Sequence, residues 1–227
     1  MENQNVITKS NHLIEAGYKL SLNEQRLVLS GISKIDSRKG IPEKIKITAK
    51  EFSDQYNLPM NKSYETLLEA ADKLYERDIQ MNDERYNTRI RWLSSRSYAR
   101  GEGYVSLSFS REVSTYLTKL KKEFTSYKAS LIRNLKSPYS IRLFELLIRW
   151  KNTGRYIVKL QDFKTNLELD GKYDRFTNLR KRVIDPSIKE LKDNCGMIIE
   201  CTPIKNGRTI ESLEFKFHTS KQQLLEL

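Results

Sequence analysis

The chain has 227 residues, 38% of them hydrophobic and 31% charged, which is the composition of a folded protein with room for one large domain or two small ones. It contains no run of about 18 apolar residues, and its start (Met1-Glu2-Asn3-Gln4-Asn5) lacks the apolar core of a signal peptide, so we expect a cytoplasmic protein without a membrane span. The formal net charge of +12 predicts an anionic partner, most often nucleic acid, although a merely basic soluble protein can carry the same total.

The first half of the chain predicts a helix, a strand, two helices and two strands, in this order. The expected ranges are 21–35, 44–48, 49–56, about 63–77, 79–93 and 104–109. Ser21 and Glu24 have the spacing of a capping box, and Ser63 can cap the last of the helices. The polar segment between the two strands predicts a loop. A helix-turn-helix followed by a β-hairpin, the wing, is the order of a winged-helix domain.

The second half predicts the same order. After Ser137-Pro138, the expected elements are a helix at 139–152, a strand at 156–160, a helix at 161–167, a helix capped by Asp174 that reaches Leu191, and strands at 197–202 and 212–217 joined at Asn206-Gly207. Residues 45–52 and 156–163 can be overlaid, because both alternate as a strand and then enter a helix that carries an acid followed by phenylalanine. Generic amphipathic segments can also match in this way by chance.

These patterns predict an α+β fold with two tandem winged-helix domains. We place the N-terminal domain at residues 1–122 and assign it dimerisation and contact with the DNA backbone. The C-terminal domain, at residues 123–227, is expected to recognise the major groove of double-stranded DNA.

The segment from Lys172 to Arg182 holds five basic residues and a single acid, Asp174. On a helical projection Phe176, Leu179 and Val183 form one face, and the basic residues gather on the other. In a helix-turn-helix the second helix enters the major groove, where Arg and Lys can bind guanine and Asn can bind adenine. We interpret the segment as a recognition helix, against the alternative of a solvated basic face. The expected DNA contacts are Lys172, Tyr173, Arg175, Asn178, Lys181 and Arg182.

The corresponding helix of the first half is acidic, and only its start, Lys62 and Ser63, is expected near phosphate. The hairpin region that follows carries Arg85, Arg89, Arg91, Arg96 and Arg100, of which Arg89 and Arg91 are our candidates for the DNA backbone or a minor groove. The same region carries Tyr86, Ile90 and Trp92, which could instead pair with a second copy as a dimer interface. Further phosphate contacts are expected from Lys205 and Arg208 at the second wing and from Lys119, Lys121 and Lys122 between the domains.

Several chemistries lack their residues. The two histidines, His12 and His218, are far apart, and with Cys195 and Cys201 they do not have the spacing of a zinc site. Gly171-Lys172 lacks the other residues of a phosphate-binding loop. We therefore expect no metal, no cofactor, no catalytic residue and no enzymatic activity. Both cysteines fall in or next to predicted strands, where they are expected to be packing residues.

Residues 124–127 (Phe-Thr-Ser-Tyr) and 135–147 (Leu-Lys-Ser-Pro-Tyr-Ser-Ile-Arg-Leu-Phe-Glu-Leu-Leu) resemble the signature of the initiator replication (Rep) proteins of theta-replicating, iteron-bearing bacterial plasmids. The segments 7–11 and 185–191 fit the same pattern. The resemblance implies binding to directly repeated origin sequences (iterons) through two winged helices, opening of an AT-rich region, and recruitment of a host initiator and replicative helicase. It also implies a monomer in equilibrium with a homodimer that represses its own gene and takes part in copy control. The recognition helix of the family's C-terminal domain maps onto residues 174–182. The corresponding helix of the first domain, at about 63–77, is acidic and in this respect departs from the family.

The leading hypothesis is therefore a plasmid replication initiator. The runner-up is a winged-helix transcriptional repressor without a replication role, because the same domains serve both functions. The third alternative is an enzyme, a primase or a nickase, against which the absence of metal-ligand clusters in the sequence argues.

Overall fold

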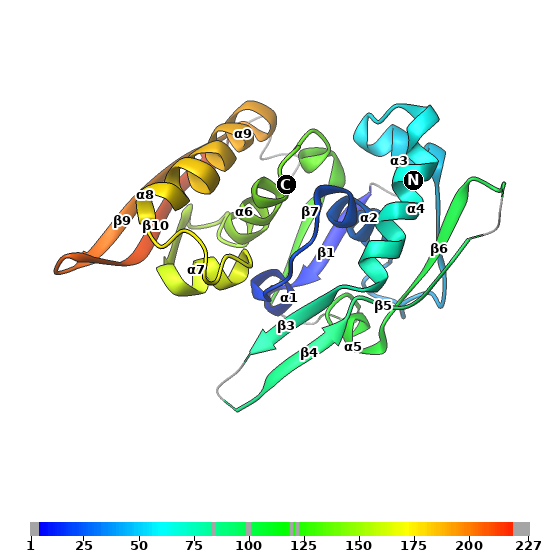
Figure 1. The fold of residues 1–227 in the computed structure, drawn as a ribbon, viewed down its shortest axis with the longest axis horizontal. Coiled ribbons are helices and arrows are strands. Elements are labelled where there is room, and N and C mark those ends of the chain that lie inside the picture. Colours follow the sequence, from blue (N-terminus) through cyan, green and yellow to red (C-terminus); the bar gives the residue numbers. More distant parts are fainter. Residues whose placement is uncertain (1–4, 83–84, 99–100, 119, 121–122, 220–227) are drawn as a thin grey trace. The chain divides into compact units, whose positions relative to one another are not determined.

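The computed structural model describes residues 5–82, 85–98, 101–118, 120 and 123–219. The chain divides into two compact units, residues 1–134 and 135–227, and each is described by itself (Figure 1). Within the described ranges no helix combines the length and the apolar character that crossing a bilayer requires.

The first unit contains a winged helix with additional elements at its ends and in its middle. In chain order its elements are β1 (Val6–Ser10), α1 (Asn11–Glu15), α2 (Leu22–Ile32), β2 (Ile45–Thr48), α3 (Ala49–Tyr56), α4 (Met60–Tyr75), β3 (Asp78–Asn82), β4 (Asn87–Arg91), β5 (Leu93–Ser97), β6 (Tyr104–Phe109), α5 (Arg111–Ser114), β7 (Phe124–Lys128) and the 3-10 helix η1 (Ala129–Ile132). The winged helix itself consists of α2, α3, α4 and an antiparallel sheet in the order β2-β6-β5.

The helix starts of this unit follow from local side-chain chemistry. Ser21 and Glu24 form the expected capping box: the Ser21 hydroxyl accepts from the Glu24 N–H, and the Glu24 carboxylate accepts from the Ser21 N–H at 2.6 Å. The expected cap at Ser63 is wrong. α4 begins at Met60, and Ser63 is fully buried with its hydroxyl donating to the carbonyl of Pro59 at 2.8 Å. Pro59, which lacks an N–H and cannot continue α3, sets the start of α4 earlier than expected.

The expected single strand at 79–93 is wrong. β3 and β4 instead pair with each other as a separate hairpin, from Asp78 opposite Arg91 to Asn82 opposite Asn87. The chain then turns at Trp92 and enters β5, which lies in the segment expected to be a loop and pairs with β6. The wing of the first unit is therefore β5–β6, and the hairpin β3–β4 is an insertion before it. Asn82 and Asn87 are residues that favour turns, so the sequence did carry this signal.

The two ends of the first unit are joined by a small sheet. β1 and β7 pair antiparallel, with Val6 opposite Lys128 and Ser10 opposite Phe124. Because β7 and η1 pack into this unit, residues 123–134 belong to it, whereas the expected boundary after residue 122 placed them with the second domain.

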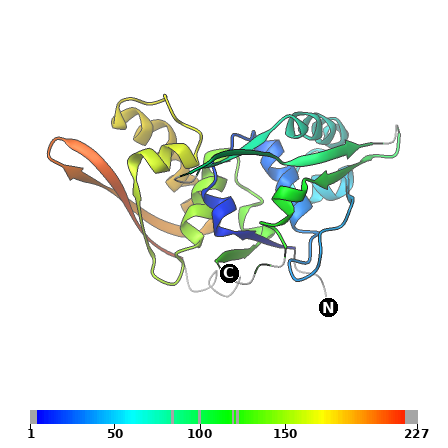
Figure 2. The same ribbon diagram turned by 90° about the horizontal axis from the view of Figure 1, so that it is seen from below.

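The second unit is a winged helix with little added. Its elements are α6 (Pro138–Ile148), β8 (Arg155–Lys159), α7 (Leu160–Asn166), α8 (Phe176–Leu179), the π-helix η2 (Arg180–Ile184), α9 (Asp185–Cys195), β9 (Met197–Asn206) and β10 (Thr209–Thr219). The sheet order β8-β10-β9 repeats that of the first unit, since in both the first strand pairs with the last. The hairpin β9–β10 extends beyond the helices of its unit (Figures 1 and 2). Its two turn residues are Gly207 and Arg208, one position later than expected, and Gly207 has a φ of 62°.

Residues 45–52 and 156–163, which can be overlaid in sequence, occupy the same positions in their two winged helices. β2 and β8 each lead directly into a helix, α3 and α7. Ile47 and Phe52 of the first unit are buried, as are Val158 and Phe163 at the matching positions of the second. The alternation that suggested the overlay is therefore a core pattern shared by both units.

The last helical region of the second unit is continuous from Phe176 to Cys195, through α8, η2 and α9. Asp174 does not cap it as expected. The residue at the cap is Arg175, whose side chain makes no capping bond. The region ends at Gly196, which has a left-handed backbone with a φ of 59°, beyond the expected end at Leu191.

Candidate nucleic-acid interface

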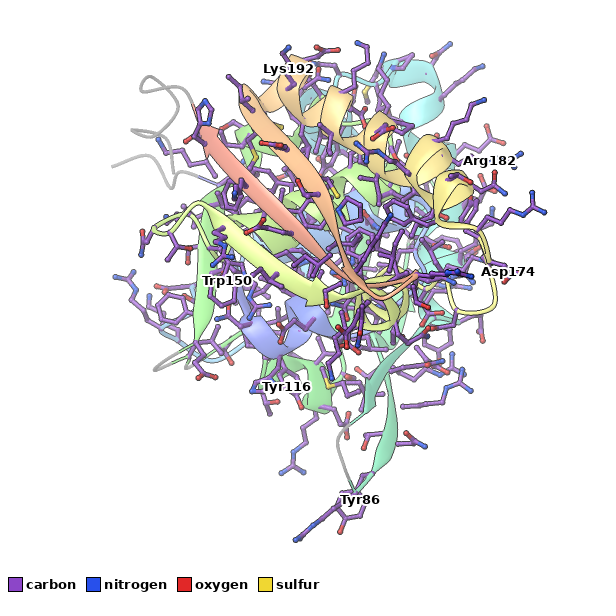
Figure 3. The ribbon with its side chains drawn as sticks, turned by 90° about the vertical axis from the view of Figure 1, so that its left-hand side faces the viewer. Tyr86, Tyr116, Trp150, Asp174, Arg182 and Lys192 are labelled. Atoms are coloured by element: carbon purple, nitrogen blue, oxygen red, sulfur yellow. The ribbon has the colours of Figure 1, made fainter. Side chains whose placement is uncertain are left out.

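The helix that runs from Phe176 to Cys195 presents one buried and one exposed face. Leu179 and Val183 are 1% and 2% exposed and face the core of the second unit. On the opposite side, four residues that the sequence placed together are all exposed: Arg175, Asn178, Lys181 and Arg182. Figure 3 shows Asp174 in the loop before the helix, Arg182 projecting outward and Lys192 nearer the other end.

Four cations at this end of the helix form no ion pair within the part of the chain that the structure describes. Among the described residues no carboxylate oxygen lies within 4.0 Å of the side-chain nitrogens of Lys172, Arg175, Lys181 or Arg182. Arg180 is the exception, since its Nε lies 3.2 Å from an oxygen of Asp185. Unpaired cations on one exposed face create a positive potential that attracts the phosphates of nucleic acid.

The turn before the helix holds Tyr173 in a left-handed backbone conformation, with a φ of 54°. This conformation is uncommon for a bulky residue, and such positions often occur at functional sites. Burial raises the pKa of Tyr139, at the start of α6, and the nearby Tyr173 raises it further. Tyr173 is half-buried beside α6, whereas its neighbour Lys172 is exposed. A DNA contact of Tyr173 therefore stays a prediction, and Lys172 is exposed next to the helix start.

The wing of the second unit ends in two exposed cations. Lys205 lies near the end of β9, and Arg208 is the second of the two turn residues. No ion pair joins either of them to another described residue. The tip therefore keeps its positive charge.

The helix of the first unit that corresponds in chain order is α4. Lys62, near its start, is exposed, but the exposed face beyond it carries Glu65, Glu69, Asp72 and Glu76. Glu69 pairs with Lys73 at 2.5 Å and Asp72 with Arg96 at 2.7 Å. Ser63, expected beside phosphate, is fully buried and donates to the carbonyl of Pro59, so its side chain is not part of the exposed surface.

The two arginines expected to contact the DNA backbone in the first unit share one acid. Asp78 lies 3.1 Å from Arg89 and 3.1 Å from Arg91, and Arg91 also contacts Glu76 at 3.4 Å. Because β3 and β4 are neighbouring strands, these pairs form across the hairpin and offset its charge. The remaining expected cations Arg100, Lys119, Lys121 and Lys122 lie outside the described residues.

The three residues expected at a dimer interface are separated by burial. Tyr86 is 67% exposed at the end of the β3–β4 hairpin (Figure 3), and Ile90 is half-buried. Trp92 is 0% exposed and packs edge-on against Tyr18 with ring centres 5.0 Å apart. Trp92 is therefore a core residue of the first unit, and its assignment to a surface interface is wrong for this structure.

The cysteines are buried and form no disulfide with each other, as expected for packing residues. Burial raises the pKa of Cys195 to about 12 and that of Cys201 to about 11, so both thiols stay protonated at neutral pH. No group of three or more potential metal ligands occurs in the described part of the chain.

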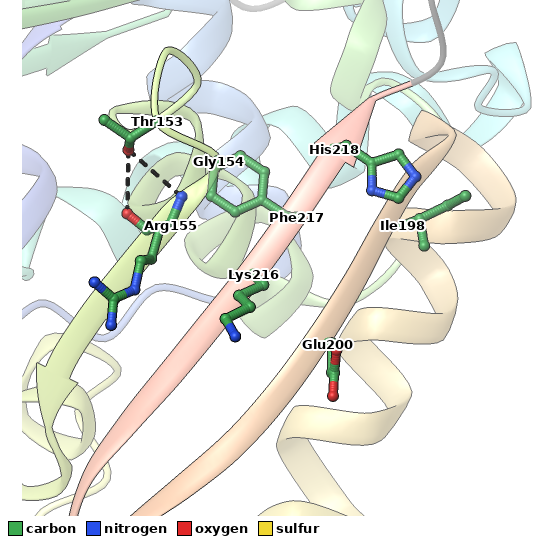
Figure 4. Close-up of a pocket in the computed structure, with 8 residues that line it drawn as sticks. All are labelled: Thr153, Gly154, Arg155, Ile198, Glu200, Lys216, Phe217 and His218. Atoms are coloured by element: carbon green, nitrogen blue, oxygen red, sulfur yellow. Dashed lines mark hydrogen bonds between the residues drawn. The ribbon is translucent and has the colours of Figure 1, made fainter.

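A hollow opens on the second unit between the ends of β8, β9 and β10 (Figure 4). Its lining residues are Thr153, Gly154, Arg155, Ile198, Glu200, Lys216, Phe217 and His218. Arg155 donates to Glu214 at 2.6 Å, and this bond lowers the pKa of the Glu214 carboxyl. The lining thus combines the acid Glu200 with the basic Arg155 and Lys216, whereas Arg175, Lys181 and Arg182 at the start of the long helix form no ion pair with a described residue.

The π-helix at Arg180–Ile184 was not anticipated from the sequence. Pro186 could have predicted this irregular turn, because proline has no N–H to donate to a backbone carbonyl inside a helix. Asp185 was likewise overlooked, although it is the acid that engages Arg180.

Comparison with known proteins matches both halves of the chain. Residues 6–148 match the family described as "Initiator Replication protein, WH1", and residues 159–217 match "Initiator Rep protein, WH2". The Escherichia coli "Replication initiation protein" is 24% identical over 230 residues, which covers 96% of this chain and 71% of that protein. The Escherichia coli "PI protein" is 28% identical over 146 residues, or 56% of this chain and 47% of that protein.

Among solved structures, the crystal structure of the Pi initiator protein in complex with iteron DNA matches with a TM-score of 0.82 and 21% identity, and covers 97% of this chain and 100% of that one. At this identity the likeness shows the fold. The expectation of two tandem winged-helix domains is confirmed.

Proposed function

The chain belongs to the family of initiator replication proteins, and from this premise we propose that it starts plasmid replication by binding repeated sequences, the iterons, at the origin. The solved Pi initiator, which shares its fold, was crystallised with iteron DNA. The proposed action is binding to double-stranded DNA, with no catalytic step and no cofactor.

The observation that carries the proposal is the exposed face at the start of the helix from Phe176 to Cys195. There Arg175, Lys181 and Arg182, which form no ion pair with a described residue, lie on the same side as Asn178. Arg175, Lys181 and Arg182 have the donors to bind guanine O6 and N7 in the major groove, and Asn178 has the donor and acceptor to bind adenine. In winged-helix and related proteins the second helix of the helix-turn-helix occupies this groove. We therefore assign sequence recognition to the second unit.

Contacts to phosphate complete the proposed interface. Arg175, Asn178, Lys181 and Arg182 form the proposed reading face. Outside it, Lys205 and Arg208 at the wing tip and Lys172 before the helix are exposed cations. Such contacts fix the position of a protein on the duplex and add affinity without reading sequence. In the first unit Lys62 is the candidate for the same role.

We further propose what the protein does once it is bound to the origin. Bound initiator would help to open an AT-rich region and recruit the host initiator and replicative helicase in the cytoplasm. A homodimer, in equilibrium with the monomer, would repress the protein's own gene and limit copy number. The exposed Tyr86 and the half-buried Ile90 on the β3–β4 hairpin are our candidates for contact between copies.

Footprinting on the DNA that flanks the gene tests the proposal. We expect protection to recur at a regular spacing of about two helical turns beside an AT-rich tract. Protection of a single palindrome at a promoter would instead identify a transcriptional repressor. Absence of protection would overturn both hypotheses, and a nick introduced into supercoiled origin DNA by the purified protein would identify an enzyme.

A further inference from the structure

The buried side of the helix from Phe176 to Cys195 has an unusual repeat. Leu179, Val183, Ser187, Leu191 and Cys195 follow each other at steps of four, and each is at most 3% exposed. In an α-helix a step of four residues overshoots a full turn by about 40°. Four such steps move a stripe by about 160°, which would carry it from the core to the solvent side.

The π-helix η2 offsets this drift. The N–H of Asp185 donates to the carbonyl of Arg180, five residues earlier, in place of the usual four. One extra residue in a turn sets the helix back by about 100°. The stripe therefore stays on the core along the whole helix, and the exposed face stays on the other side.

Two side chains hold this wide turn. Pro186 has no N–H to give to the carbonyl of Arg182, and its ring collides with that carbonyl in a regular α-helix. Asp185 accepts from the Nε of Arg180 at 3.2 Å. The residues joined by the backbone bond of the wide turn are thus also joined by their side chains.

Resting on the proposed function, we infer that Asp185 and Pro186 are positioning residues for DNA recognition. The part of the helix after them is fixed to the core by Leu191 and Cys195. The part before them carries the residues proposed to read bases. The wide turn sets the rotation of the first part relative to the second around the helix axis. Without it, the reading face would be rotated around this axis by about 100°.

The ion pair at this turn also affects the charge that the helix presents to DNA. Asp185 is an acid on the exposed side of a helix proposed to face phosphates, and its pairing with Arg180 offsets that charge. Arg180 is bound to Asp185, so it differs from Arg175, Lys181 and Arg182, which form no ion pair with a described residue.

The test measures specificity and stability in the full-length chain. Two duplexes of equal length are compared, one with the repeat that the wild-type chain protects beside its gene and one with the same bases scrambled. For Pro186→Ala we expect at least a tenfold loss of affinity for the repeat and no loss for the scrambled duplex, because the net charge is unchanged. The unfolding midpoint should stay the same or rise, since proline in a helix interior is unfavourable.

Two results would overturn the role of Pro186. One is unchanged affinity for the repeat. The other is an equal loss on both duplexes together with a lower midpoint, which would mark the proline as a purely structural residue. Pro138→Ala, at the start of α6, is the matched control and should leave the preference for the repeat unchanged.

Asp185→Asn tests the second residue without altering the backbone. It frees Arg180, so binding to the scrambled duplex should rise while the preference for the repeat falls severalfold. Asp193→Asn is the control, because it frees Lys189 on the same helix away from the wide turn. An equal change of preference in both variants would reduce the effect to net charge and refute the positioning role of Asp185.

The two proposals fail in different ways. If the wild-type chain does not prefer the repeat over the scrambled duplex, the proposed function itself is wrong. If the wild-type chain does prefer it and Pro186→Ala and Asp185→Asn keep the same preference, only the positioning role is wrong.

Discussion

The helix α4 of the first unit and the helix from Phe176 to Cys195 of the second occupy the same place in the order of a winged helix, yet their exposed faces carry opposite charge. α4 presents four acids after Lys62, and Lys73 and Arg96 pair with two of them. The helix of the second unit presents Arg175, Lys181 and Arg182 without ion pairs to any described residue.

The fold sets the position of the helix, whereas the side chains on its exposed face determine what the helix can bind. Both units have the same sheet order, and both bury the matching pairs Ile47/Val158 and Phe52/Phe163, so these shared features do not distinguish them. Charge does, because an acidic face repels the phosphates that a basic face attracts. We infer a division of labour in which the second unit reads sequence and the first contributes position and contact between copies.

Substitutions on the reading face should weaken DNA binding most. Arg175→Ala and Arg182→Ala should each weaken binding to the repeat by about 1–3 kcal/mol and reduce its preference over a scrambled duplex. Lys62→Ala in α4 should weaken both duplexes equally and by less, because a phosphate contact carries no sequence information. Equilibrium titrations with both duplexes give the comparison.

Lys192→Ala is the control for charge, since Lys192 is exposed on the same helix but near its other end (Figure 3). It should leave the preference for the repeat unchanged. If Lys62→Ala instead lowers the preference as much as Arg182→Ala does, the division of labour between the two units is wrong.

The sequence predicted the elements whose signals are local and periodic. The capping box at Ser21 and the alternation at 45–48 and 156–159 depend on neighbouring residues, and the structure has them where expected. The exposed positions of the reading face follow from helical periodicity in the same way.

The wrong predictions concern residues whose surroundings are set by other parts of the chain. Trp92 looked like a surface aromatic because its partner, Tyr18, lies far away in the sequence. Ser63 looked like a cap until Pro59 was seen to start the helix earlier. Likewise, the charges of Arg89 and Arg91 are offset by Asp78 only once β3 and β4 have paired.

The wing of the second unit should have a smaller effect of a different kind. Lys205→Ala and Arg208→Ala should weaken the repeat and the scrambled duplex alike, and each lost phosphate contact should reduce the slope of log affinity against log salt by about 0.9. Lys44→Ala, an exposed lysine before β2, serves as a control for net charge. A selective loss on the repeat would show that the wing reads bases, and recognition would then no longer belong to the helix alone.

The smallest expected effect concerns the β3–β4 hairpin of the first unit. Asp78→Asn keeps the shape of the side chain but removes the charge that engages Arg89 and Arg91. If this hairpin lies along the DNA, binding to any duplex should strengthen slightly at low salt, and the salt slope should steepen by up to about 1 for each cation that gains a phosphate. Asp36→Asn is the matched control. Asp36 is ionised at neutral pH like an ordinary aspartate, and its hydrogen bonds with Arg38 lower its pKa further, to about 2. Both variants therefore change the net charge equally. If the two variants bind DNA equally well, the hairpin does not touch the duplex. The first unit's remaining candidate for DNA contact among the described residues is then Lys62, and the contrast between the two units becomes sharper.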